Sequence, residues 1–147
     1  PDGRELDGSE STLPSTLGNA NTRDLAWEPG RPHRLEIRRG AAGWAGSVDG
    51  LEIRELHAGG DALTGIMVWS EVFARCDDPP VVVRWSELEG TTPEGATVRP
   101  DAVVTRYQPV ADGGCSNTTS ALDGAGGVVQ RTAVTREVAP GAVLALR

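Results

Sequence analysis

Glu71 is the strongest candidate for a catalytic residue in this sequence. It lies inside the apolar run VWSEVF of residues 68–73, where burial would raise its pKa towards that of a general acid. Strand alternation would place it on the same face as Trp69 and Phe73. Glycoside hydrolysis also needs a second carboxyl about 5 to 10 Å away. A carboxylate paired with an arginine, or simply facing outwards, is the interpretation that we favour, so we lean away from an enzyme.

Oxygen ligands for a hard cation occur in two separate loops. Asp77 and Asp78 stand in a turn that contains two prolines, and Asn117 and Asp123 stand in a later loop rich in glycine. Carboxylate and amide oxygens suit Ca²⁺. No EF-hand spacing is present, however, and an aspartate close before a proline commonly begins a turn. We therefore predict no cofactor, with Ca²⁺ at these four residues as the alternative.

The two cysteines, Cys76 and Cys115, lie beside these same loops. They fit none of the close-paired spacings of metal sites. We predict one disulfide between them and an extracellular or cell-surface location. On the chain-entropy model, closing a loop of about 40 residues stabilises the fold by roughly 4 kcal/mol. Two free thiols in a cytosolic protein are the alternative, and a joint ligand site between the loops would require the disulfide.

Aromatic rings are the groups that a sugar-binding surface would use. The candidate ligand-binding residues are Trp27, Trp44 and Tyr107. Trp44 has glycines on both sides, at positions 43 and 46, and is therefore predicted to be the most exposed ring. Trp69 and Trp85 lie within apolar runs and are predicted to belong to the core.

The charge of the chain narrows the range of its partners. Its 147 residues include 14 basic residues, all of them arginine, against 21 acidic residues, for a net charge of −7. Binding to nucleic acids or to anionic membrane surfaces needs a basic footprint, so the net charge argues against both as partners. No apolar run approaches the roughly 18 residues of a membrane helix, which argues against membrane insertion. The absence of lysine indicates GC-rich coding, as in an actinobacterium.

Short strands are the elements that must position these residues. Residues 33–38 alternate between apolar and charged side chains, and Asp49-Gly50 is a hairpin turn leading into a further strand. The stretch 63–85 contains two apolar runs around a proline-rich break and predicts two buried strands. No segment shows a sustained helical period. We predict an all-β fold of eight to ten strands, an antiparallel two-sheet β-sandwich or jelly roll with one disulfide.

The chain divides by composition into an arm and a domain. Residues 1–24 are polar and rich in Gly, Ser, Thr and Asn, which is typical of an arm. Residues 25–147 are predicted to form a single β-sandwich domain, since a chain of this length is one domain. The arm, or the last predicted strand at residues 142–146, could add to the sheet edge of another copy.

Several turn motifs occur in an order that resembles a known group of proteins. They are GNANTR at 18–23, WEPG at 27–30, GWAG at 43–46 and VDG at 48–50. The chain resembles secreted bacterial β-sandwich domains of unknown function that have a concanavalin-like lectin and glucanase jelly-roll character. The resemblance implies a lectin-like fold and contact with polysaccharide. The glucanase carboxylate motif Glu-x-Asp-x-x-Glu is missing, so hydrolytic activity is not implied.

Three hypotheses about function follow from these observations. The first is a secreted or cell-surface β-sandwich module that binds carbohydrate. The alternative is a structural subunit of an extracellular assembly or filament, a homo-oligomer joined by exchange of a terminal strand. A glycoside hydrolase built around Glu71 is the least favoured of the three.

Overall fold

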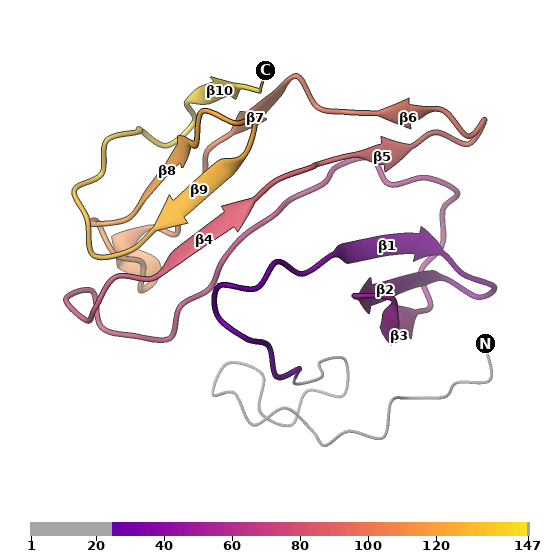
Figure 1. The fold of residues 1–147 in the computed structure, drawn as a ribbon, viewed down its shortest axis with the longest axis horizontal. Coiled ribbons are helices and arrows are strands. Elements are labelled where there is room, and N and C mark those ends of the chain that lie inside the picture. The colour runs from indigo at the N-terminus through magenta and orange to yellow at the C-terminus, as the bar shows by residue number, and fades with distance from the viewer. Residues whose placement is uncertain (1–24, 147) are drawn as a thin grey trace. The chain divides into compact units, whose positions relative to one another are not determined.

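The structure is a computed structural model that describes residues 25–146. The arm predicted over residues 1–24 lies outside the described residues. Contacts between residues divide the chain into two compact units, of which the first ends at Leu63 and the second begins at Thr64. The described part contains ten strands, all in antiparallel pairs, and a single short 3₁₀ turn (Figure 1). The predicted all-β class is confirmed, whereas the single sandwich stays a prediction.

The described part of the first unit forms a three-stranded antiparallel meander. Its strands are β1 (Leu35–Arg39), β2 (Trp44–Val48) and β3 (Leu51–Leu56), paired in the order β1-β2-β3 (Figure 1). The β2–β3 turn at Asp49-Gly50 has a positive φ at both residues, 52° and 81°. Two-residue hairpin turns of this kind match the twist of the strands, and Asp followed by Gly tolerates them best. The hairpin signal read from the sequence is therefore confirmed.

A β-bulge interrupts the second edge strand of this sheet. In β3, Glu52 pairs with Ser47 and Arg54 with Gly46, which leaves Ile53 without a partner residue. The edge strands β1 and β3 begin with the same tetrapeptide, Leu-Glu-Ile-Arg, but only β1 keeps a regular register throughout. Because a bulge shifts the alternation by one residue, β3 can place residues 51 and 56 on one face.

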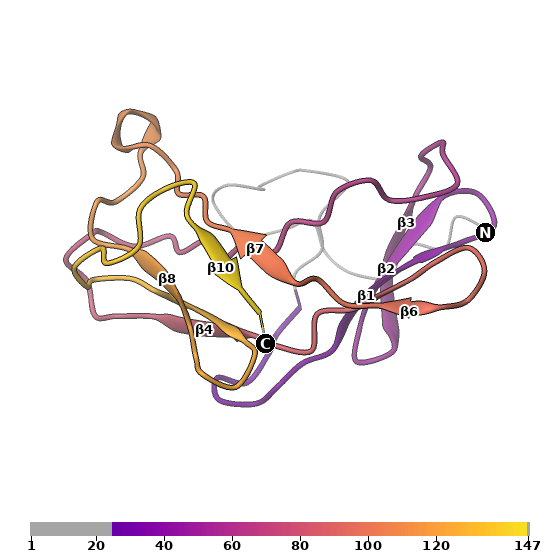
Figure 2. The ribbon, with the colours of Figure 1, turned by 90° about the horizontal axis from the view of Figure 1, so that it is seen from above.

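The second unit is built from three small sheets. The largest has the order β4-β9-β8, and the other two pair β7 with β10 and β5 with β6. Their bounds are β4 (Val82–Trp85), β5 (Gly90–Thr91), β6 (Thr97–Val98), β7 (Ala102–Val104), β8 (Thr119–Leu122), β9 (Val128–Arg131) and β10 (Val143–Ala145), with the 3₁₀ turn η1 at Val110–Asp112. Figure 2 shows β7 and β10 side by side. The buried apolar residues Val128 and Val129 lie in β9, the central strand of the largest sheet.

The first of the two strands predicted within residues 63–85 is absent. Residues 64–81 pair with no strand, although β4 forms where the second was predicted. Side chains in the segment still alternate, with Val68, Ser70 and Val72 half-buried between exposed neighbours. Trp69 is 63% exposed, so its predicted place in the core is wrong. Alternation reports which way a side chain faces, but a strand also needs a ladder partner, and this segment has none.

The predicted disulfide is present. Cys76 and Cys115 are bonded, with their Cα atoms 5.5 Å apart and a separation of 39 positions in the sequence. The amide nitrogen of Asn117 donates to the carbonyl oxygen of Cys76 at 2.6 Å. The bond and this contact fasten the turn that follows residue 75 to the loop that precedes β8.

Candidate functional site

The β1–β3 sheet has two chemically different faces. Directly paired residues share a face, so the register places nine residues on one side, called here the apolar face. Six of them are apolar, namely Leu35, Ile37, Trp44, Val48, Leu51 and Leu56, and the other three are Gly46, Arg39 and Arg54. The opposite side, the charged face, carries Glu36, Arg38, Glu52 and Glu55 around Ala45 and Ser47. The bulge in β3 brings Leu51 and Leu56 to the same side.

The charged face closes over the central strand with its own side chains. Arg38 on β1 donates from Nη2 to Glu52 Oε2 on β3 at 2.9 Å. Since their partners on β2 are Ala45 and Ser47, this ion pair crosses β2 diagonally. Ala45 is 2% exposed and Ser47 is buried. A pair this open to solvent contributes less than about 1 kcal/mol, but its aliphatic stems shield the strand below.

The apolar face is left largely open. Leu35 and Ile37 are 54% and 62% exposed, and Leu51 and Leu56 are each close to half exposed. One face of an antiparallel sheet normally faces water, and that face is normally the polar one. In this sheet the apolar side chains are exposed as well as the charged ones. Contiguous exposed apolar side chains of this kind mark interaction surfaces.

An exposed aromatic ring stands before β1. Trp27 is 62% exposed, and its ring centroid lies 5.8 Å from that of His33. His33 Nδ1 lies 2.7 Å from Asp49 Oδ2, and Asp49 Oδ1 accepts the main-chain N–H of Arg34 at 2.8 Å. That N–H, and after it His33, lowers the pKa of Asp49. The hairpin aspartate therefore fixes the imidazole that backs the Trp27 ring.

The other two predicted ligand-binding aromatics are more enclosed. Trp44 is half-buried, with the Arg39 guanidinium 5.6 Å from its ring centroid. Its glycine neighbours did not make it the most exposed ring, because Arg39 pairs with it across the sheet. In the second unit, Arg136 lies 4.1 Å from the Tyr107 ring centroid, and the Tyr107 hydroxyl accepts the N–H of Ser120 at 2.9 Å. Tyr107 thus anchors β8.

Glu71 lies exposed on the segment before the disulfide turn. The alternation predicted for it is confirmed, since Trp69 and Phe73 are exposed with it. The burial that would make it a general acid is absent. Its neighbour Ser70 donates to Gln130 Oε1 at 2.6 Å, and Trp85 Nε1 donates to the same oxygen at 2.9 Å. Gln130 was missed from the sequence, where a single amide within an apolar strand is its only signal.

The four calcium candidates are partly brought together. The disulfide places Asn117 against the turn that carries Asp77 and Asp78, as its pairing implied. Both aspartates face Arg75, whose Nε lies 3.6 and 3.7 Å from their oxygens. Within residues 25–146, no three acidic, histidine or cysteine side chains are grouped as metal ligands. The calcium alternative stays a prediction.

Asp123 organises the turn between β8 and β9. Its Oδ1 accepts the N–H groups of Ala125 and Gly127 at 2.7 and 2.9 Å, and its Oδ2 accepts from Arg84 Nε. The Ala125 N–H, followed by Arg84 and Gly127, lowers the pKa of Asp123 to about 2. Its oxygens are therefore engaged within the hairpin.

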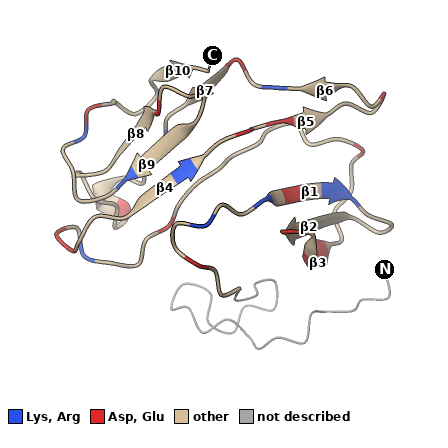
Figure 3. Cartoon of the chain, in the orientation of Figure 1, with Lys and Arg blue, Asp and Glu red and all other residues tan. Residues whose placement is uncertain are grey.

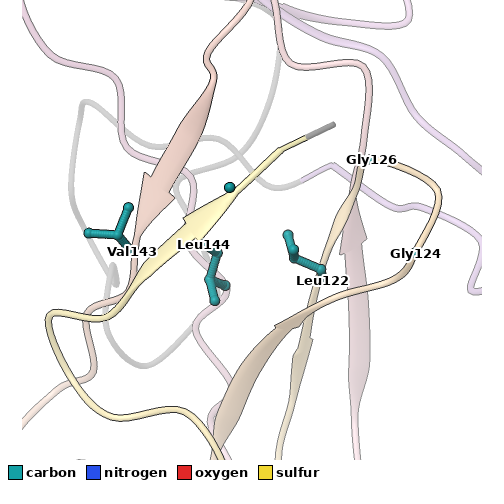
Figure 4. A pocket seen from close by; sticks show the side chains of 6 residues that line it. Leu122, Gly124, Gly126, Val143 and Leu144 are labelled. Atoms are coloured by element: carbon teal, nitrogen blue, oxygen red, sulfur yellow. The ribbon is translucent and has the colours of Figure 1, made fainter.

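A hollow of about 360 Å³ lies beside the same hairpin. It is lined by Leu122, Gly124, Gly126, Val143, Leu144 and Ala145 (Figure 4). The lining side chains are all apolar or absent, so they offer no group that would orient a polar ligand.

Comparison with protein-family models, curated proteins and solved structures finds no match. In the described part of the chain, no helix has the length and apolar character needed to cross a bilayer. The class that the structure defines is an all-β protein with one disulfide. Its most distinctive surface is the apolar face of the β1–β3 sheet.

Proposed function

We propose that this chain is a secreted or cell-surface structural module that assembles with other copies of itself through the β1–β3 sheet. The observation that carries the proposal is the exposure of the apolar face. Leu35, Ile37, Leu51 and Leu56 all remain about half exposed or more. Burying apolar area stabilises an association by roughly 25 cal/mol per Å², so this face supplies the driving force.

Two further features support the proposal. A disulfide suits an oxidising compartment, and the Cys76–Cys115 bond is formed. The predicted exchange of the last strand is less favoured than the β1–β3 sheet, because β10 already pairs with β7 in its own chain. Exchange of the arm over residues 1–24 stays a prediction.

The proposal is tested by solution mass. Light scattering and sedimentation velocity over a wide concentration range should show reversible association of the parent protein. Leu51→Thr should weaken it about three- to twelvefold, since burial of a leucine is worth roughly 1.5 to 3 kcal/mol and only the exposed half of this one remains to be buried. Val98→Thr, at an exposed apolar position of the second unit, is the matched control. A parent that stays monomeric, or association that Leu51→Thr leaves unchanged, would refute the proposal.

Carbohydrate binding is the second candidate, and the Trp27 ring favours it. An exposed indole, backed by a histidine that Asp49 holds in place, is the kind of platform on which a sugar ring stacks. Soluble polysaccharides should then quench or shift tryptophan fluorescence, and Trp27→Ala should remove that response. An unchanged spectrum across a panel of polysaccharides would count against this function without touching the assembly proposal.

A further inference from the structure

Among residues 25–146, no strand pairs with the outer edge of β1. β1 is the first strand of the order β1-β2-β3, and all five of its residues are exposed. The opposite edge strand, β3, is interrupted by its bulge. Bulges are one of the devices by which proteins blunt a sheet edge. Of the two edges of this sheet, β1 is therefore the one that keeps a regular template.

The main-chain groups that β1 offers can be identified from the ladder. Two hydrogen bonds flank the strand: Asp49 N–H donates to Arg34 O, and Gly40 N–H donates to Gly43 O, both at 2.8 Å. Antiparallel ladders alternate, so every second residue between them, Glu36 and Arg38 included, also directs its main-chain groups at β2. Leu35, Ile37 and Arg39 must then direct their N–H and C=O groups away from the sheet.

We propose that two copies of this chain join through antiparallel pairing of β1 with β1, centred on Ile37. This inference rests on the proposed self-assembly and adds to the contact through the apolar face a second contact at the sheet edge. In this register Ile37 lies opposite Ile37 of the second copy, and Leu35 lies opposite Arg39. The main-chain groups of these residues point outwards, so each facing pair can exchange the two N–H···O bonds of a hydrogen-bonded antiparallel pair.

Charge selects this register among the three that pair at least three residues of β1 with β1 of the second copy. Figure 3 shows acidic and basic residues together on β1. With the centre at Ile37, Glu36 of each copy lies opposite Arg38 of the other, and the two-fold axis repeats the attraction. A centre at residue 36 would oppose Glu36 to Glu36, and a centre at residue 38 would oppose Arg38 to Arg38. Both alternatives place like charges at the close, non-hydrogen-bonded positions, which destabilises them.

The pairing also extends the apolar face. Residues 35 and 37 lie on that face, so the two-fold axis sets the exposed Leu35 and Ile37 of one copy beside those of the other. The result is a continuous six-stranded sheet with one apolar side. Cross-strand contacts of this kind each contribute modestly, so a reversible dimer is expected rather than an obligate one.

Charge reversal tests the proposal on the whole protein. Glu36→Arg makes residues 36 and 38 both basic, and Arg38→Glu makes both acidic, so each variant alone should self-associate at least about tenfold more weakly than the parent. An equimolar mixture restores both attractions, and should dimerise to within about threefold of the parent. Glu94→Arg, at an exposed turn position, carries the same change in net charge as Glu36→Arg and should behave as the parent.

Rescue by mixing separates pairing from folding. Arg38→Glu also breaks the contact with Glu52, but a folding defect would not be repaired by adding the other variant. β1 pairing is refuted if the parent associates and each variant associates as strongly as the parent. It is also refuted if the mixture associates no more strongly than either variant alone. In both cases the self-assembly proposal stands. If the parent is a monomer up to millimolar concentration, both proposals fall.

Discussion

The disulfide offers the most direct test of how the second unit is stabilised. Replacing both cysteines, in Cys76→Ser/Cys115→Ser, removes a cross-link that closes 39 positions of sequence. The chain-entropy relation gives an entropy loss of about 13 cal/mol/K for a loop of that size, which is about 4 kcal/mol at 25 °C. Small domains are stable by only about 5 to 15 kcal/mol. We therefore expect the double variant to lose a large share of its stability.

Guanidinium denaturation followed by circular dichroism would measure this loss. The midpoint should fall, and hydrogen exchange should locate the weakened protection in β8 and β9, which follow Cys115 in the chain. Asn117→Ala is the matched control, because it removes only the hydrogen bond to the carbonyl of Cys76 and should cost about 1 kcal/mol. A double variant that loses no more than this control would refute the argument, since the loop would then be ordered without the cross-link.

Three further predictions concern single positions. The pKa of Asp123 is about 2 in the folded protein against an ordinary value of 3.8. The stabilisation that its carboxylate contributes should therefore be complete above pH 3.8 and be lost as the pH falls from 3.8 to 2. Asp123→Asn should flatten that part of a pH–stability curve. Tyr107→Phe should cost about 1 to 3 kcal/mol in thermal unfolding, because the buried N–H of Ser120 loses its acceptor. Gly43→Ala should disrupt the β1–β3 sheet in two-dimensional NMR spectra, since the added methyl group would overlap a main-chain carbonyl of β3, whereas Gly59→Ala meets no atom and should be silent.

The two proposed functions make different demands on the same unit. Self-assembly uses the apolar face and the β1 edge, and carbohydrate binding uses the Trp27 ring before β1. Glu36→Arg should therefore weaken association and leave any polysaccharide response intact. Trp27→Ala should do the reverse, so the pair of variants assigns each activity to its own surface.

Local patterns in the sequence determined much of this structure. The Asp49-Gly50 turn predicted a hairpin because these two residue types tolerate positive φ. The alternation around Glu71 predicted its neighbours correctly, since successive side chains of an extended chain face opposite ways. The pairing of Cys76 with Cys115 followed from their number and spacing. Each of these features depends on residues close in sequence or on covalent chemistry.

Tertiary structure decided the features that depend on partners distant in sequence. Residues 64–81 have the composition of a buried strand but find no ladder partner, so Trp69 is exposed. The tetrapeptide Leu-Glu-Ile-Arg forms a regular strand in β1 and a bulged one in β3. Asp123, a candidate cation ligand in the sequence, lies against Arg84, which is 39 positions away. A sequence pattern fixes the direction in which a side chain points on its own strand. The pairing register of a strand, and whether its side chains are buried, depend on segments that are distant in sequence and come together only in the folded protein.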